Sequence, residues 1–175
     1  MSLKELTVEK HRAAEKSPFM HAVFNGTMPL TMWADYTYNK WAFYSMLENR
    51  AQEYPIFSDL IELGLQRADL MFMDAFYMGA PDAFIKPSTN QYIDYLSKLD
   101  ERGILAHVYV WHMGDLYGGQ LIKKLLPEAS HENLEFEDPE ALRNALRAKL
   151  SDDLAEEANI AFDWAIRIMN EYIPV

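Results

Sequence analysis

The sequence contains no cysteine, and this absence excludes several kinds of chemistry. Without thiols the protein can form no disulfide, no thiolate metal site and no cysteine nucleophile. The sequence also lacks a run of about 18 uncharged apolar residues, the length that predicts a transmembrane helix. Its first stretch, MSLKELTVEKHRAAEK, carries charges throughout and has no apolar segment, so we predict no secretory signal. We therefore expect a soluble, cytoplasmic protein with no membrane association.

Basic residues are also few, since 16 lysines and arginines stand against 27 aspartates and glutamates, for a net charge of −11. Binding to nucleic acid requires a basic surface that neutralises phosphates, so we expect no nucleic-acid partner. Hydrophobic side chains, in contrast, make up 50% of the 175 residues. This length and composition predict a single folded domain, residues 1–175, with a sizeable core.

Helical periodicity dominates the chain and no alternation typical of strands persists, so we predict an all-α fold. The first expected helices start at Leu3 after the Ser2–Glu5 capping box, at Pro18 with an end near Gly26, and after Thr31 as cap with an end near Glu53. Further helices are expected at about 58–78, at 88–100 and from 103 to Pro127. The last is expected from 140 to about 171 after the Asp138–Pro139 cap, either continuous or restarting at Ser151. Leu3, Leu6, Ala13 and Ala14 are expected on the inner side of the first helix. The turn-rich stretch MGAPDAFIKPST separates two of the others.

The segment WHMGDLYGGQLIKKLL contains three of the chain's seven glycines, although its apolar periodicity predicts a helix. A glycine inside a helix costs about 0.5–1 kcal/mol relative to alanine. Gly114 and Gly118 lie four residues apart, so both remove side chains from one helical face. Close helix–helix packing would explain this pattern, and so would a flat ligand laid against the backbone. The residues alone leave both interpretations open.

Five histidines are candidates for a ligand role. His11 lies on the first helix between Thr7 and Glu15, one turn from each, where a lone histidine is usually structural or solvated. His107 should share a helical face with Gly114, because seven residues differ in phase by only about 20°. His112 is about 200° from Gly114 and should point away from the glycine face. We expect His112, His21 and His131 to be structural or solvated.

Charged residues suggest further possibilities, each with a simpler alternative. Glu128 and His131 have the Glu-x-x-His spacing of a di-iron carboxylate site, but such sites need two of these motifs on helices and this one stands alone after Pro127. Arg143 and Arg147 are four residues apart and could hold two carboxylates, or form part of a solvated helix face.

Two segments together resemble one family. AHVYVWHMGDLYGGQLIKK is similar to the distal-helix signature of heme oxygenases, in which a Gly-Asp-Leu-x-Gly-Gly-Gln core is typical. LKELTVEKHRAAEKSPFM resembles the proximal helix of the same family, and the order and separation of the two segments also match. The resemblance extends more weakly from about Leu3 to Tyr172. It implies a helical bundle that holds heme between a proximal and a distal helix.

The resemblance also implies roles for individual residues. His11 matches the axial ligand of the heme iron, and Gly114, Gly118 and Gly119 match glycines that let the distal helix cross the heme face. Asp115, with Gly114 and Tyr44, matches the catalytic set, in which the carboxylate helps to deliver protons through ordered water. Lys4, Tyr109, Arg143 and Arg147 match residues that contact the heme propionates, and Phe162 matches an aromatic residue of the distal pocket. If His11 is not the ligand, His107 is the first alternative.

Three positions depart from the family pattern. Trp111 stands where an arginine able to pair with the aspartate is common, His112 replaces a common tyrosine, and Ala165 replaces an asparagine. Because Trp111 cannot form that ion pair, we expect Asp115 to depend on Tyr44 and water instead. The proton network around Asp115 must therefore be built differently in this chain.

The resemblance predicts a heme oxygenase that opens heme b with O₂ and electrons, releasing biliverdin, iron and carbon monoxide. The expected partners are a ferredoxin-type electron donor and a downstream bilin reductase. A local basic patch for the donor could come from surface residues, namely Lys10, Arg12, Lys16, Lys123 and Lys124. Two alternatives remain open: a heme binder or sensor that has lost turnover, and a protein of the same fold that acts on another small molecule without heme.

Overall fold

The computed structural model describes residues 1–80 and 84–173, and within those ranges the regular structure is helical throughout. The helices are α1 (Leu3–Glu15), α2 (Pro18–Phe24), α3 (Leu30–Gln52), α4 (Ser58–Glu62), α5 (Ala68–Tyr77), α6 (Pro87–Ser97), α7 (Glu101–Leu125), α8 (Pro139–Arg147) and α9 (Ala155–Asn170), with 3-10 turns at η1 (Pro55–Phe57), η2 (Glu132–Leu134) and η3 (Asp152–Leu154). The predicted all-α fold is confirmed. The turn expected within MGAPDAFIKPST includes residues 81–83, which lie outside the described part. No described helix is long and apolar enough to span a bilayer.

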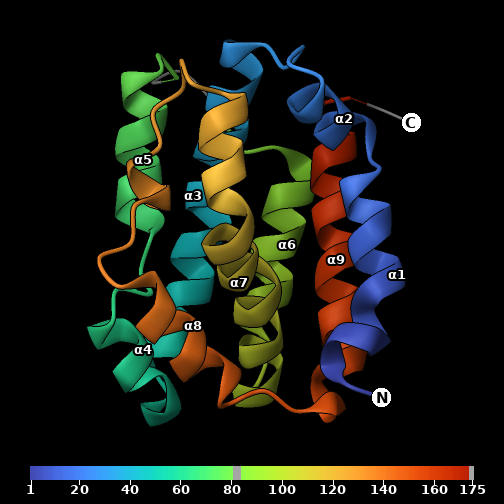
Figure 1. Cartoon of the computed structure of the whole chain (residues 1–175), viewed down its shortest axis with the longest axis vertical. Helices are drawn as coiled ribbons and strands as arrows, with labels where there is room; N and C mark the ends of the chain where they lie inside the picture. The colour runs from blue at the N-terminus through green and yellow to red at the C-terminus, as the bar shows by residue number, and fades with distance from the viewer. Residues whose placement is uncertain (81–83, 174–175) are drawn as a thin grey trace.

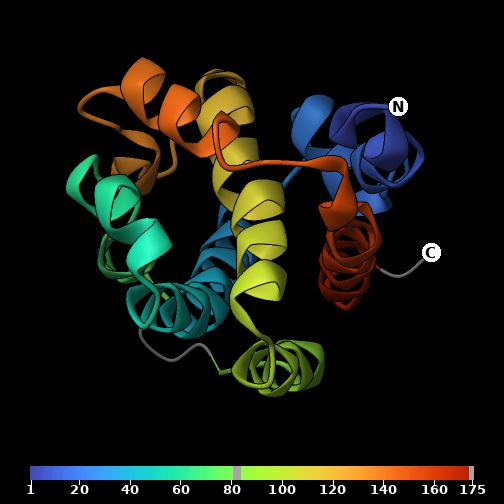
Figure 2. The ribbon, with the colours of Figure 1, turned by 90° about the horizontal axis from the view of Figure 1, so that it is seen from below.

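The helices form two groups on either side of α7, which runs through the middle of the molecule (Figure 1). On one side α3 packs against α5, α6 and α7. On the other side α9 packs against both α7 and α1, and the view from below shows α1 and α9 next to each other, apart from α3 (Figure 2). Helix α1 is therefore joined to α7 largely through α9, and the two helices that the sequence singles out stand opposite each other.

The first helix begins as the sequence predicts but buries a narrower stripe. The Ser2 hydroxyl accepts a hydrogen bond from the Glu5 N–H at 3.3 Å, and the Glu5 carboxylate accepts one from the Ser2 N–H at 2.7 Å, which completes the capping box. Leu6 is only half-buried, however, and Ala13 is exposed. The expectation that both face the core is wrong because α9 covers one side of α1 only.

Helix α3 begins two residues earlier than predicted. The carbonyl of Pro29 accepts the first helical hydrogen bond from the Trp33 N–H at 3.0 Å, so Pro29 occupies the N-cap position and lacks a side-chain cap. Thr31 lies inside the first turn and is exposed, which makes its assignment as the cap wrong.

The helix predicted at 58–78 is two helices, α4 and α5. Gly64 adopts a left-handed conformation with φ of +89°, which ends the first of them. The second begins where the buried carboxylate of Glu48, on α3, accepts hydrogen bonds from the Arg67 and Ala68 N–H groups at 2.7 and 2.9 Å. The cap of α5 comes from a residue 20 positions away, and no local pattern could indicate it.

The remaining helix ends agree with the sequence more closely. Asp100 caps α7 by accepting a hydrogen bond from the Gly103 N–H at 2.9 Å, and α7 ends just before Pro127. Asp138 caps α8 in the same way through the Ala141 N–H at 3.1 Å. Of the two alternatives for the last segment, the structure has the restart: α8 ends at Arg147 and α9 begins at Ala155.

Candidate active site

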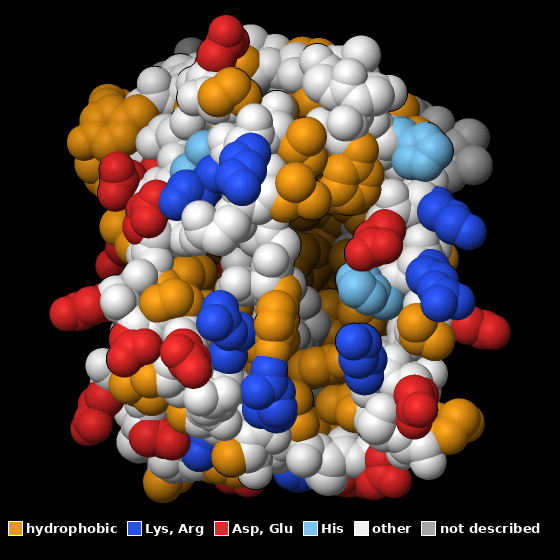
Figure 3. Space-filling view, in the orientation of Figure 1, with side chains coloured by type: hydrophobic (Ala, Val, Ile, Leu, Met, Phe, Trp, Pro, Cys, Tyr) orange, Lys and Arg blue, Asp and Glu red, His pale blue; other side chains and the backbone are white. Residues whose placement is uncertain are grey.

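A cavity of about 1180 Å³ opens between α1 and α7. It is slightly larger than the roughly 300–1,000 Å³ typical of small-molecule sites. The space-filling view shows the hollow with hydrophobic side chains inside, a histidine on its wall and lysine or arginine side chains near its rim (Figure 3). The candidate site residues that line it are Lys4, His11, Tyr109, Gly114, Asp115, Gly118, Arg147 and Phe162. A second cavity of about 240 Å³ shares His11, Gly114, Asp115 and Gly118 and also touches Gly119.

One wall of the cavity presents His11. Its side chain is 55% exposed, so the ring is accessible, and the ring centroid lies 5.5 Å from that of Phe162 on α9. The Nε2 atom lies 3.1 Å from a carboxylate oxygen of Glu15, one helical turn further along α1. Metal-binding histidines commonly use one ring nitrogen for the metal and the other for such a carboxylate, which fixes the ring. The i,i+4 spacing of His11 and Glu15 in the sequence is the signal that indicates this contact.

The opposite wall contains the glycines of α7, and they fall into two groups. A Cβ atom built on Gly114 or Gly118 would meet no neighbouring atom within 4 Å, so both backbones face open space. A Cβ on Gly119 would lie 3.1 Å from Cδ2 of Leu134, so Gly119 permits close packing against η2. Both interpretations of the glycine pattern are therefore needed. Gly119 also lines the smaller cavity, so its expected place at the ligand face stays a prediction beside this packing role.

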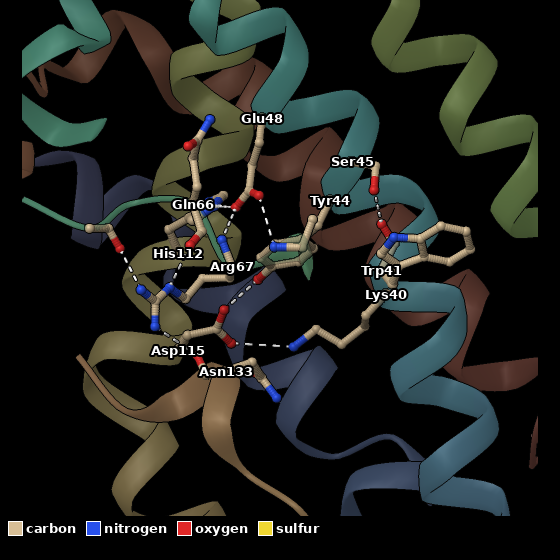
Figure 4. Close-up of polar contacts among 12 residues, drawn as sticks. Lys40, Trp41, Tyr44, Ser45, Glu48, Gln66, Arg67, His112, Asp115 and Asn133 are labelled. Atoms are coloured by element: carbon tan, nitrogen blue, oxygen red, sulfur yellow. Dashed lines mark hydrogen bonds and ion pairs between the residues drawn. The ribbon is translucent and has the colours of Figure 1, made fainter. Parts of the chain in front are cut away.

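Asp115 follows Gly114 and lies at the junction of α3 and α7 (Figure 4). Its Oδ2 accepts a hydrogen bond from the Tyr44 hydroxyl at 2.6 Å, and its Oδ1 lies 3.3 Å from Nζ of Lys40. Burial, reinforced by the charge of Asp115, raises the pKa of Tyr44 well above its usual value, so the phenol stays protonated and donates a hydrogen bond to the carboxylate. The expected contact between Asp115 and Tyr44 is present, and the dependence of Asp115 on it stays a prediction. We did not predict the role of Lys40.

Tyr44 is fully buried and does not itself line the cavity. It reaches Asp115 from the α3 side, so any effect of Tyr44 on a ligand in the cavity passes through the Asp115 carboxylate.

His112 points away from the cavity, as its helical phase predicts. The ring is buried, and its Nε2 lies 2.9 Å from Oε2 of Glu48, the carboxylate that also caps α5 (Figure 4). His112 therefore joins α7 to α3 and to the start of α5. His131 is also structural, since its Nε2 lies 2.7 Å from the carbonyl oxygen of Leu126, and His21 is exposed.

His107 does not reach the cavity, although it is seven residues from Gly114. Its ring is buried under α9, with Nδ1 2.5 Å from the Tyr92 hydroxyl and Nε2 2.9 Å from Glu157. Burial raises the pKa of Tyr92 and lowers the pKa of His107, so the phenol donates to a neutral imidazole, which donates in turn to Glu157. The indole N–H of Trp111 also donates to the Tyr92 oxygen, at 2.8 Å. The alternative of His107 as an iron ligand is therefore wrong.

The predicted propionate-binding residues are only partly brought together. Lys4, Tyr109 and Arg147 line the cavity, and the Arg147 guanidinium donates a hydrogen bond to the hydroxyl of Tyr117. Arg143 does not line it; its guanidinium carbon lies 5.4 Å from the centre of the Tyr117 ring. The two arginines share one aromatic partner, but only Arg147 reaches the cavity.

The comparisons with known proteins decide the family. A family model described as heme oxygenase matches residues 1–171. The chain belongs to the heme oxygenase family. Among curated heme oxygenases, heme oxygenase 2 of Rattus norvegicus is 28% identical over 97% of this chain, and the heme oxygenase of Guillardia theta is 27% identical over 98%. The chain spans 64% of the rat protein's length and 84% of the algal protein's length.

Solved heme oxygenase structures have the same fold. Heme oxygenase-1 from the cyanobacterium Synechocystis, in complex with heme, matches with a TM-score of 0.86 and 22% identity, covering 97% of this chain and 89% of that one. The heme oxygenase from Leptospira interrogans matches with a TM-score of 0.84 and 22% identity, covering 97% of both chains. The arrangement of helices around the cavity is thus that of heme oxygenases.

The residues of this cavity also fit heme on chemical grounds. An accessible imidazole with a carboxylate partner stands on one wall, an arrangement common among metal-binding histidines. The other wall has no side chain at Gly114 and Gly118, which leaves space for a flat ring system. A lysine and an arginine at the rim can pair with carboxylates.

Proposed function

We propose that this protein is a heme-degrading oxygenase, which uses O₂ and electrons to open heme to biliverdin, with release of iron and carbon monoxide. Heme would be both substrate and cofactor, since its iron supplies the chemistry with O₂ and its ring is opened. The observation that carries the proposal is the cavity in which His11 and the exposed backbone of Gly114 and Gly118 share one space with Asp115.

The chain's own residues would bind and orient the ring. His11 would coordinate the iron, with Glu15 holding the imidazole in one orientation. Lys4, Tyr109 and Arg147 would hold the propionates at the rim, with Arg143 acting through Tyr117. The predominantly apolar lining would exclude water from the rest of the ring.

Asp115 would manage protons on the Gly114 side of the ring. The Tyr44 hydroxyl donates to one of its oxygens, so the carboxylate is held as an acceptor that orders water in the cavity. The absence of side chains at Gly114 and Gly118 keeps a strong acid from lying directly against the ligand. Protons would then arrive through water ordered by Asp115, rather than directly from a side chain.

The electron donor is proposed to be a ferredoxin-type protein, and a bilin reductase to take the product. The chain is acidic overall, so an acidic donor needs a local basic patch. Candidates are Lys10 and Arg12 on α1, Lys16 at its C-cap, and Lys123 and Lys124 at the end of α7. Lys123 contacts Glu135, and Lys10 contacts Asp163 at 2.6 Å, which reduces the charge that either offers.

Anaerobic titration of the purified protein with hemin, followed by a ferredoxin reducing system in air, tests the proposal. We expect a Soret band to form with one equivalent of hemin and then to decay as a bilin absorbance appears. The Asp115→Asn variant should bind hemin with similar affinity and form bilin much more slowly. Hemin binding without bilin formation in the wild-type protein would instead indicate a heme binder, and absence of binding would refute the assignment altogether.

A further inference from the structure

Helix α3 presents a stripe of three side chains toward the cavity and Asp115. Tyr36, Lys40 and Tyr44 are spaced by four residues, so they follow one another along one face of the helix. Tyr36 and Lys40 line the cavity, and Tyr44 lies behind Asp115. Lys40 is unusual there, because its side chain is only 12% exposed although it carries a charge.

The carboxylate of Asp115 is held at both of its oxygens by this stripe. The Tyr44 hydroxyl contacts Oδ2 at 2.6 Å, and the Lys40 ammonium contacts Oδ1 at 3.3 Å. The Asp115 side chain is only 9% exposed, so its charge has little water to stabilise it. A buried carboxylate in such a place needs an opposite charge and hydrogen-bond donors, and the stripe provides both. Two different donors on two oxygens also fix the plane of the carboxylate.

Aromatic rings hold the lysine itself in place. Its Nζ lies 5.1 Å from the ring centroid of Tyr44 and 5.9 Å from those of Tyr36 and Trp111. Ammonium groups are attracted to aromatic faces at such distances, so the rings restrict a long and otherwise flexible side chain. Trp111 contacts Lys40 only through the face of its ring, because its indole N–H group donates a hydrogen bond to the Tyr92 hydroxyl.

Among the residues that the structure describes, no other cation forms an ion pair with this carboxylate. Arg67 approaches the same region, but its guanidinium donates to the backbone carbonyls of Gly64 and Glu135 at 2.9 and 2.8 Å. On α7, the residue one turn before Asp115 is Trp111, which has no charge. The positive partner of Asp115 therefore comes from α3.

We propose that Lys40 is a positioning residue for Asp115: it fixes Oδ1 and balances the carboxylate charge, so that Asp115 orders water toward the ligand beside Gly114. This inference rests on the proposed heme-opening activity. It makes Lys40 part of the site without requiring that it touch the ring, and it assigns to α3 the cationic partner that α7 does not provide.

The contact is measured first in the ligand-free protein, by thermal unfolding of Lys40→Met, Asp115→Asn and the double variant. We expect the loss of Tm in the double variant to be clearly smaller than the sum of the two single losses, because each single variant already removes the interaction between Lys40 and Asp115. Lys86→Met is the matched control. Lys86 is also a partly buried lysine, 3.9 Å from Asp35 and 4.6 Å from the centre of the Tyr172 ring, but it lies outside the cavity. Lys86→Met and Asp115→Asn should be additive.

The role in the reaction is then measured by hemin affinity and by the rate of bilin formation. Lys40→Met should bind hemin within about threefold of the wild type and form bilin at least about tenfold more slowly, with the loss in kcat and not in KM. Lys40→Arg, which keeps the charge, should recover most of the rate. In the ferric hemin complex, the pH midpoint of the visible-spectrum change should rise in Lys40→Met, because a positive charge near the ring favours deprotonation of a nearby water. Lys86→Met should leave rate and midpoint unchanged.

A Lys40→Met variant with the wild-type rate would overturn the proposal, and so would additive unfolding losses of Lys40→Met and Asp115→Asn. Equal slowing by Lys86→Met would also overturn it, by showing a general effect of lost lysines. If the wild-type protein itself forms no bilin, the proposed function fails and the role of Lys40 in it fails too. That result is distinct from an active wild type with an equally active Lys40→Met.

Discussion

Replacing Gly114 or Gly118 with alanine should make the ligand-free protein more stable while weakening its interaction with hemin. Both glycines lie within α7, where alanine is favoured over glycine by about 0.5–1 kcal/mol. The added Cβ would meet no atom within 4 Å, so no packing cost opposes this gain. For a chain of this length, about 1 kcal/mol corresponds to a rise in Tm of roughly 2–4 °C. The same methyl group would protrude into the space that the ring needs, so hemin affinity and bilin formation should fall.

Gly119→Ala is the matched control, because it makes the same chemical change in the same helix. Its Cβ would lie 3.1 Å from Cδ2 of Leu134, so Leu134 must shift and the gain in helix propensity should be offset. Circular dichroism melts of the three ligand-free variants, together with hemin titrations, provide the measurement. If Gly114→Ala and Gly118→Ala lower the Tm as much as Gly119→Ala does, these glycines serve internal packing. The argument that they provide ligand access would then be wrong.

Three further predictions concern other parts of the site. His11→Ala should weaken hemin binding and nearly abolish bilin formation until free imidazole is added; an unchanged ferric spectrum would show that another residue binds the iron. Replacing Arg143 and Arg147 together with Met should weaken hemin binding about fivefold, since one exposed ion pair, that of Arg147, contributes up to about 1 kcal/mol. The same change should not affect binding of hemin dimethyl ester, whose carboxylates are masked. Burial lowers the pKa of His107 in the folded protein. As the pH drops below about 6.5, this histidine therefore takes up a proton in the unfolded chain but not in the folded chain, and the free energy of unfolding should fall. His107→Gln should flatten this part of the pH profile in urea titrations, and identical profiles would contradict the argument.

Much of the site could be predicted from the sequence because its signals are local. The Ser2–Glu5 capping box marks the start of α1, and His11 lies at a fixed distance along that helix. Gly114, Gly118 and Asp115 lie on one helix, where spacing alone determines the shared face.

The features that could not be predicted depend on contacts between distant segments. Lys40 and Asp115 are 75 residues apart, and nothing near either one indicates the pair. The different role of Gly119 depends on Leu134, which reaches α7 only after the chain has left that helix and returned. The break between α4 and α5 depends likewise on Glu48, whose carboxylate caps the second helix from outside. Helix periodicity cannot show which side of a helix a later segment will cover.

The packing of α1 on α9 has a consequence for when the protein becomes competent. His11, on α1, is made before α7, whereas α9, the helix that packs against both α1 and α7, is made after it. A nascent chain that has completed α7 already contains His11, Gly114 and Asp115, but it lacks α9, the main packing partner of the helix that carries His11. The wall with His11 is therefore fully supported only after α9 has been made, and we expect chains that end before Ala155 to bind hemin more weakly than the whole chain.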